Sequence, residues 1–251
     1  MDRRFLSQTE VIAASRRFVC VRLLTYEDRH EADFLKQLFV GRSGELENTT
    51  FVVLSPDGRQ QLLRAGRAPP GNQGAVALAE TLNRLAAQYP PRKADGDPLL
   101  PRIASVRLAL DVAACDNRPL AVVHAADAVA LQQLEERLRP LAWSDDLLGR
   151  LVYASTTDAR HLQAIEGVAP SSGLLVIQPD RYGVKGKVLS QTTAKAPVLD
   201  WRRTLQEGIA AYQPTDKTFP QHIRDGQRAG IFWDTVLPVT DPLEKRAREK
   251  R

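Results

Sequence analysis

The alternation of strand-like and helix-like segments in the second half of the chain constrains its fold more than any other feature. The strand-like runs are short and apolar, whereas the helix-like segments carry apolar residues three or four positions apart. In chain order the segments are 118–125, 127–143, 150–155, 156–167, 173–179, 186–192 and 198–212. The predicted order is βαβαββα, so the first strands run parallel through right-handed crossovers and the last two form an antiparallel hairpin.

The first half repeats most of this pattern. An apolar run that ends in a Pro-Asp turn occurs in both halves, as FVVLSPDG at 51–58 and LLVIQPDRYG at 174–183, and predicts a strand that enters a hairpin. The remaining periodicity predicts a helix, a strand, a helix, a hairpin and a closing helix. These elements are expected at 7–17, 18–26, 27–40, 49–66 and 72–89. Such an internal repeat indicates two domains of one kind, the first without an opening strand.

This order of elements resembles that of the thioredoxin fold. The resemblance implies an α/β protein with tandem thioredoxin-like domains, each a mixed sheet with flanking helices, the first lacking its opening strand. We expect the incomplete domain at 1–90, a linker at 91–114, the second domain at 115–214 and a C-terminal extension at 215–251. The Pro-rich and charged stretch PPRKADGDPLLP at 90–101 supports the linker.

The resemblance also implies where redox chemistry would reside. Redox members of the family carry C-x-x-C at the start of the first helix, where the helix N-terminus stabilises a thiolate, and a cis-proline before the third strand faces the sulfurs. In the second domain ADAVALQQ at 126–133 holds no cysteine, and the cis-proline position falls near Ser172, with Pro170 close by. In the first domain that position falls at Thr49. Thiol chemistry is therefore not expected in the second domain.

The beginning of the chain leaves two interpretations of the first domain open. Arg3, Arg4 and Phe5 are similar to the basic and aromatic residues that follow C-x-x-C in many family members, which places Asp2 at or beside the second cysteine position. Either this domain has lost its catalytic pair, or an opening strand and the motif lie upstream of Met1.

The leading hypothesis is a thioredoxin-like protein with a degenerate redox site that acts by binding a protein or peptide, without catalytic residues, a metal or a cofactor. The residues expected at the binding face are Asp2, Arg3, Thr49, His124 and Ser172. The alternative is a thiol-disulfide oxidoreductase whose C-x-x-C lies upstream of Met1. A third candidate is a basic adaptor for an acidic partner. The chain as given is expected in the cytoplasm, and the alternative implies the periplasm or secretion.

Cysteine usage and charge argue against several other classes. Cys20 and Cys115 are too few for a disulfide framework; Cys20 is expected to be buried in a strand and Cys115 to lie in an exposed loop. The four histidines lack metal-ligand spacing. Part of the net charge of +5 lies in EKRAREKR at 244–251, so nucleic-acid binding is not expected. No apolar run is long enough to span a bilayer, so a soluble protein is expected.

The C-terminal extension contains one strongly apolar stretch, GIFWDTVLPV at 230–239. Exposing it would be costly, at about 25 cal/mol per Å² of apolar area, so burial is expected. The residues expected to be buried are Ile231, Phe232, Trp233 and Val236. The stretch is predicted to pack on the protein's own domains, and the alternative is docking to another protein.

Overall fold

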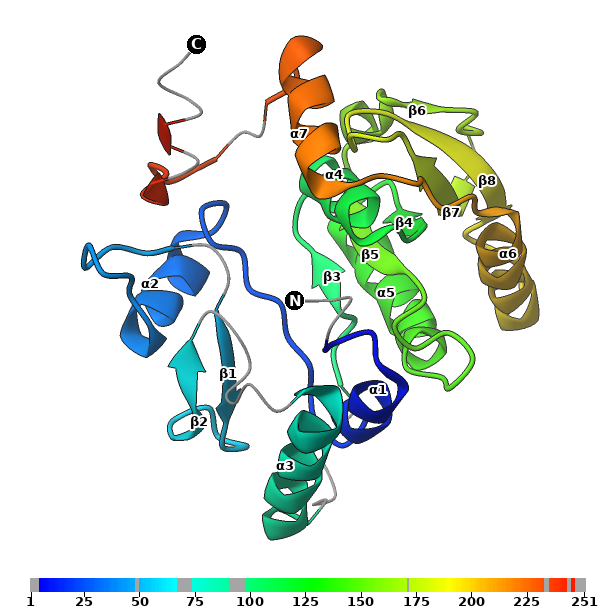
Figure 1. Cartoon of the computed structure of the whole chain (residues 1–251). Helices are drawn as coiled ribbons and strands as arrows, with labels where there is room; N and C mark the ends of the chain where they lie inside the picture. The colour runs from blue at the N-terminus through cyan, green and yellow to red at the C-terminus, as the bar shows by residue number, and fades with distance from the viewer. Residues whose placement is uncertain are drawn as a thin grey trace. The chain divides into compact units, whose positions relative to one another are not determined.

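The computed structural model describes residues 5–47, 50–66, 74–90, 98–170, 172–232, 235–242 and 245–246, with the backbone alone at 172 and 219. The chain forms two compact units (Figure 1). Unit 1 comprises Met1–Lys93 together with Trp233–Arg251, and unit 2 comprises Ala94–Phe232. The last part of the chain therefore belongs with the first, and each unit is described separately below.

Unit 2 contains a six-stranded mixed sheet with the order β3-β5-β4-β7-β8-β6. The central strand β4 runs parallel to β5 and antiparallel to β7, and β7 forms a hairpin with β8. The strands are β3 (Arg102–Ile103), β4 (Leu120–His124), β5 (Val152–Thr156), β6 (Ile165–Glu166), β7 (Ser172–Pro179) and β8 (Gly186–Thr193). The predicted α/β class with a mixed sheet is confirmed.

Helices cover both faces of this sheet. Alternate residues of a strand point to opposite faces, and Leu120 and Val122 pack in one apolar cluster while Ala121 and Val123 pack in the other. On the first face lie α4 (Val106–Asp116) and the short 3₁₀ helix η2 (Ala159–Leu162), and on the second lie α5 (Ala128–Ala142) and α6 (Val198–Ala211). Burial on both faces explains why β4 is a continuous apolar run in the sequence.

Local sequence signals fix the ends of these helices. The Ser105 side chain accepts a hydrogen bond from the backbone N–H of Leu108, and Asp127 accepts one from Ala130, so each caps a helix N-terminus. In α6, a Cβ at Gly208 would lie 2.3 Å from Val176 Cγ1 on β7. Glycine at this position therefore allows α6 to approach the sheet closely.

Two helices occupy segments that the sequence analysis assigns to the linker and to the C-terminal extension. Residues 106–114, assigned to the linker, belong to α4 (Val106–Asp116), because Val106, Ala109, Leu110 and Ala113 supply a buried apolar stripe. Residues 219–228, assigned to the extension, form α7 (Phe219–Arg228) in unit 2. Conversely, the helix predicted at 156–167 is reduced to η2 followed by β6.

Unit 1 contains a two-stranded antiparallel sheet, with helices before and after it in the chain. The elements are α1 (Thr9–Ser15), α2 (Arg29–Leu38), β1 (Phe51–Leu54), β2 (Gln61–Gly66) and α3 (Gly74–Gln88). Val11 and Ala14 of α1 pack with Val53 of β1 and Leu78 and Leu82 of α3 in one apolar cluster. The helices and the hairpin predicted from the sequence are confirmed.

The repeated Pro-Asp turn connects the two strands of a hairpin in each unit. In unit 1 the Asp57 carboxylate accepts a hydrogen bond from the backbone N–H of Arg59, and Gly58 has a φ of +72°. In unit 2 Asp180 accepts bonds from the backbone of Tyr182 and Val184, and Gly183 has a φ of +70°. The aspartate thus holds the turn, and glycine supplies its left-handed residue.

The strand predicted at 18–26 is wrong. Val19 and Val21 are 85% and 70% exposed, and Cys20, expected to be buried, is also exposed. Apolar and β-branched residues favour an extended backbone, but a strand also needs a hydrogen-bonding neighbour, and no described residue forms a ladder with 18–26.

The apolar stretch of the tail is only partly buried. Leu237 packs in a small cluster with Tyr26, Ala32 and Leu46 of unit 1, as expected for a stretch that packs on its own protein. Val236, expected to be buried, is exposed. Its backbone N–H and that of Leu237 both donate to the carbonyl of Tyr26, so these bonds and the Leu237 side chain hold the segment. Trp233 lies outside the described residues.

Candidate functional site

Polar side chains gather in unit 2 where β4 and β5 end. His124 and Thr156 are the last residues of these strands and lie opposite each other in the parallel ladder. The backbone N–H of Ala125 also donates to the Thr156 carbonyl at 3.2 Å, which extends the pairing beyond both strands. In α/β sheets, ligands bind beyond the carboxyl ends of the parallel strands. This edge of the sheet is therefore the first place to seek a binding site.

The junction between β4 and α5 is the place where the predicted resemblance would put a redox motif. It consists of His124, Ala125, Ala126 and the helix cap Asp127, and it contains no thiol. Cys115 lies instead in the last turn of α4, where it is exposed; the predicted loop is a helix there, and only the predicted exposure is confirmed. Cys20 belongs to unit 1.

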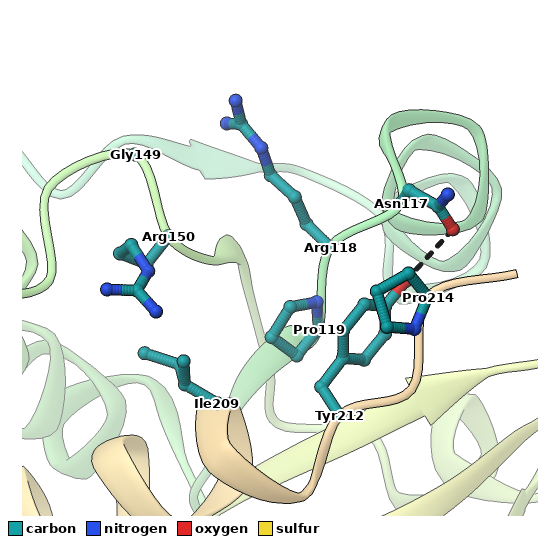
Figure 2. Close-up of a pocket in the computed structure, with 8 residues that line it drawn as sticks. All are labelled: Asn117, Arg118, Pro119, Gly149, Arg150, Ile209, Tyr212 and Pro214. Carbon is teal, nitrogen blue, oxygen red and sulfur yellow. Dashed lines mark hydrogen bonds between the residues drawn. The ribbon is translucent and has the colours of Figure 1, made fainter.

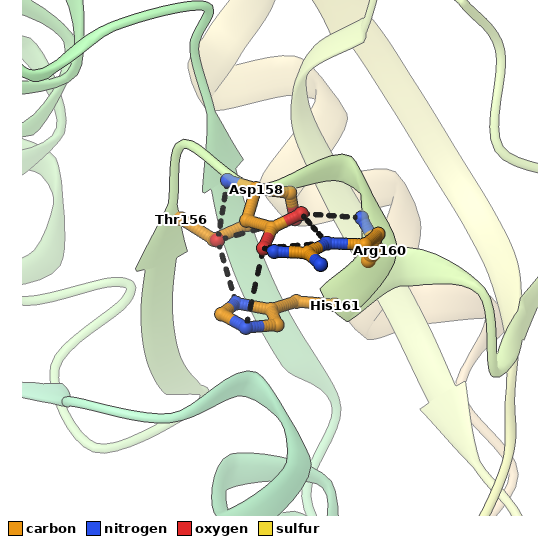
Figure 3. Close-up of polar contacts among 4 residues, drawn as sticks. All are labelled: Thr156, Asp158, Arg160 and His161. Atoms are coloured by element: carbon orange, nitrogen blue, oxygen red, sulfur yellow. Dashed lines mark hydrogen bonds and ion pairs between the residues drawn. The ribbon is translucent and has the colours of Figure 1, made fainter.

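A compact polar cluster lies at the end of β5 and in the turn that follows it (Figure 3). The Thr156 hydroxyl lies 2.9 Å from His161 Nδ1 and accepts a hydrogen bond from the backbone N–H of Asp158 at 3.0 Å. The Asp158 carboxylate caps η2 by accepting from the backbone N–H of Arg160 at 2.9 Å. It also accepts hydrogen bonds from Nε and Nη2 of the same arginine at 3.0 and 2.7 Å. Figure 3 shows all four side chains folded over one short turn.

Electrostatics in this cluster favour the ionised carboxylate. Hydrogen bonds from Arg160 lower the pKa of Asp158 to about 2, and the same contact raises the pKa of Arg160. Both groups face solvent, so the pair serves mainly to fix the geometry of the turn. The cluster resembles a hydroxyl-histidine-carboxylate triad only superficially. The distance of 3.9 Å from His161 Nε2 to Asp158 Oδ2 exceeds a hydrogen bond, and Thr156 is buried.

A pocket of about 200 Å³ opens beside His124. Its lining is mostly apolar, with an imidazole and one amide as polar groups, and comes from the end of β4, from η2 and from the loop before β7. The residues are His124, Ala159, Leu162, Gln163, Val168, Ala169 and Pro170. The Gln191 side chain on β8 holds that loop, accepting from the Ala169 N–H at 2.9 Å and donating to the Gly167 carbonyl at 3.0 Å. The pocket therefore has walls that hydrogen bonds keep in place.

A second pocket, of about 300 Å³, lies at the opposite ends of the same strands, before β4 and β5 begin (Figure 2). It is lined by Asn117, Arg118, Pro119, Gly149, Arg150, Ile209, Tyr212 and Pro214. Two arginines and no acidic residue line it, which distinguishes it chemically from the pocket at His124.

Of the residues predicted for binding, His124 alone is described with its side chain, and it lines a pocket. Ser172 begins β7 and pairs with Thr193, and its backbone alone is described. Asp2, Arg3 and Thr49 lie outside the described residues. The structure therefore brings His124 together with residues that the sequence analysis did not select.

The missed residues are Thr156, Asp158, Arg160, His161 and the apolar lining. Their sequence, TTDARHL at 156–162, directly follows a predicted strand, and Thr or Asp two residues ahead of a turn is a signal for side-chain capping. The sequence analysis assigns 156–167 to one helix and therefore does not predict this loop.

Comparisons with known proteins add no assignment to this geometry: no protein-family model, curated protein or solved structure matches the chain. Within the described ranges no helix is both long and apolar enough to cross a membrane. The same residues contain no cluster of three or more histidine, cysteine, aspartate or glutamate side chains placed to hold a metal ion.

Proposed function

We propose that the chain is a thioredoxin-like protein with a degenerate redox site, and that unit 2 binds a protein or peptide partner at the pocket beside His124. The observation that carries the proposal is the β4–α5 junction. This junction has a histidine, two alanines and an aspartate where a redox protein needs thiols, and a pocket opens next to it.

The strand order supports the thioredoxin-like part of the proposal. Strand β4 lies between parallel β5 and antiparallel β7, the β7–β8 hairpin follows, and α6 comes after the hairpin. The βαβ connection and the terminal hairpin are the arrangement that the resemblance implies. Fold alone does not give activity, so the function must be argued from the site.

The thiol inventory supports binding over disulfide exchange. Exchange by a dithiol requires an attacking thiolate and a resolving thiol within bonding reach. Unit 2 holds one cysteine, Cys115, on α4, which covers the face of the sheet opposite to α5. The junction at the start of α5 has no sulfur to attack a substrate.

The pocket suits one apolar side chain of a peptide. Leu162, Val168 and Pro170 provide apolar walls, and about 200 Å³ is the scale of a single large side chain rather than of an organic cofactor. His124 and Gln163 at the same pocket can exchange hydrogen bonds with a peptide backbone. Peptide recognition commonly combines an apolar anchor with such main-chain bonds.

To test the proposal, peptides that bind the full-length chain are selected from a random display library. Val168→Arg, which places a charged side chain in the pocket, should weaken the selected peptides at least about tenfold in fluorescence polarisation. Val129→Arg adds the same side chain at a position on α5 that is 70% exposed, and it should leave binding unchanged.

The same protein preparations are then tested in an insulin-reduction assay with dithiothreitol. We expect the rate of a no-protein control, because the thiol pair is missing. Stimulation that disappears in Cys20→Ser or Cys115→Ser would overturn the non-catalytic assignment. Peptides that bind Val168→Arg and the unaltered chain equally would overturn the assignment of the pocket.

A further inference from the structure

The pocket at the beginning of β4 and β5 places two arginines side by side. Leu120 pairs with Val152 in the parallel ladder, and Arg118 and Arg150 each precede these partners by two residues. A hydrogen bond of 3.0 Å from the Val152 N–H to the Pro119 carbonyl continues the pairing toward them. Figure 2 shows the two residues on neighbouring backbone segments, with the Arg118 side chain extending away from Pro119 and the Arg150 side chain directed toward the side of Ile209.

These two guanidinium groups lack the acidic partners that several other arginines of unit 2 have. Arg202 lies 2.7 Å from Asp146 and Arg160 lies 2.7 Å from Asp158, whereas no described residue forms an ion pair or side-chain hydrogen bond with Arg118 or Arg150. Two like charges on the neighbouring segments that lead into β4 and β5 repel each other. An anion bound between them would remove that repulsion.

The rest of the pocket forms a fixed and largely apolar wall. Tyr212 donates to Asn117 Oδ1 at 3.4 Å, and the Asn117 amide exchanges bonds of 2.9 Å with both the N–H and the carbonyl of Thr215. These contacts hold the segment that contains Tyr212 and Pro214 against the end of α4 (Figure 2). Ile209 and Pro119 complete the apolar lining. A volume of about 300 Å³ reaches the range of small-molecule sites.

We infer that this pocket binds a small organic phosphomonoester, with the phosphate between Arg118 and Arg150 and the organic group against Tyr212 and Pro119. A phosphomonoester carries close to two negative charges at neutral pH, which matches two guanidinium groups, whereas a monocarboxylate matches one. Arginine presents a planar fork of donors that suits phosphate oxygens. The site lies at the opposite edge of the sheet from the His124 pocket, so it is independent of the proposed peptide site.

Phenyl phosphate is the probe for this site, titrated into the ¹⁵N-labelled full-length chain and followed by amide chemical shifts. We expect saturable shifts at residues 117–119, 149–151 and 209–215, and no such shifts with phenol. Arg118→Gln and Arg150→Gln should each weaken binding about tenfold, because each removes a charge-assisted contact. The double variant should show no saturation.

A matched control removes the same charge elsewhere in unit 2. Arg203→Gln with Arg228→Gln alters two exposed arginines on α6 and α7 and should leave the affinity unchanged. Arg118→Lys with Arg150→Lys keeps the charge but loses the planar fork, and it should bind with intermediate affinity.

Three results would overturn the inference: linear, non-saturating shifts with phenyl phosphate, an equal loss of affinity in the Arg203/Arg228 variant, or unchanged affinity in the Arg118/Arg150 double Gln variant. Inorganic phosphate should bind more weakly than phenyl phosphate. Equal affinity for the two would overturn the assignment of the organic group to the Tyr212 wall.

Discussion

Two apolar segments that look alike in the sequence differ sharply in the structure. Residues 120–123 form the centre of β4, and each of their side chains is completely buried. Residues 18–26 are also rich in apolar residues, yet Val19 and Val21 face solvent and no described strand pairs with this segment. The difference teaches that composition selects an extended backbone, whereas neighbouring strands and helices decide whether that backbone becomes a strand.

The same contrast separates the cores of the two units. In unit 2, apolar clusters lie on both faces of a six-stranded sheet, and four fully buried residues of β4 contribute to them. In unit 1, one cluster joins a hairpin to α1 and α3, and a separate small one surrounds Tyr26. Because burial of apolar area is the main favourable contribution to folding, we expect unit 2 to be the more stable.

Amide hydrogen exchange should reveal the largest difference. The amides of 120–123 are central to a sheet and open only with unit 2 as a whole, so they should exchange at least about a thousandfold more slowly than those of 19–23. Mass spectrometry of the full-length chain measures both segments in one experiment. Protection of 19–23 comparable to that of β4 would show that this segment is paired, and would break the comparison.

Removal of the largest buried side chain of unit 2 should produce the next largest effect. Trp201 is completely buried on α6, its indole N–H donates to the Thr193 carbonyl at 3.2 Å, and the Arg137 guanidinium lies 5.3 Å from its ring centroid. Trp201→Ala should lower the free energy of unfolding of unit 2 by about 3–5 kcal/mol in urea denaturation. Loss of the side chain leaves a cavity that the surrounding strands cannot fill.

A second tryptophan of unit 2 provides the control for that measurement. Trp143 is partly exposed, and its indole N–H donates to the Leu99 carbonyl at 2.9 Å. Trp143→Ala should cost only about 1 kcal/mol. In Trp201→Ala, hydrogen exchange should accelerate through β4 and β7 and stay unchanged in α1 and α3. Equal acceleration in both units would contradict the division into separate cooperative units.

Predictions from sequence succeeded where one local signal decides the outcome. The turn residues Asp57 and Asp180 determine hairpins through contacts with their own neighbours, and Asp127 caps α5 in the same way. In β4, consecutive residues are apolar, which indicates a strand that is buried on both faces. These features depend on residues a few positions apart, so the sequence displays their causes directly.

The failures concern contacts between distant parts of the chain. Whether 18–26 has a pairing partner, or whether α4 packs on the sheet, depends on residues far away in the sequence. The candidate site shows the same limit. His124 is predicted because it ends a strand near the place where the resemblance puts the redox motif. Its pocket also needs Val168 and Pro170, which only the completed sheet brings near it.

The smallest predicted effect concerns two buried tyrosines, one in each unit. Tyr153 on β5 is 3% exposed, and its hydroxyl has no hydrogen-bond partner in the described part of the chain. Tyr26 of unit 1 is 4% exposed, but its hydroxyl donates to the Leu46 carbonyl at 3.2 Å and accepts from the Asp241 N–H at 2.9 Å. The unit with the larger buried apolar clusters thus contains the unsatisfied hydroxyl.

The same substitution should therefore have opposite signs in the two units. Tyr153→Phe removes a desolvated hydroxyl without loss of a bond and should stabilise unit 2 by about 1 kcal/mol, whereas Tyr26→Phe breaks bonds and should destabilise unit 1 by about 1 kcal/mol. Burial raises the pKa of Tyr153, so its hydroxyl is neutral at pH 7 and the comparison involves no change of charge. Urea denaturation followed by segment-resolved hydrogen exchange assigns each change to its unit. If Tyr153→Phe destabilises unit 2, this hydroxyl has a hydrogen-bond partner, such as an ordered water. Hydrogen bonding would then offset the cost of burying the Tyr153 hydroxyl as it does for Tyr26.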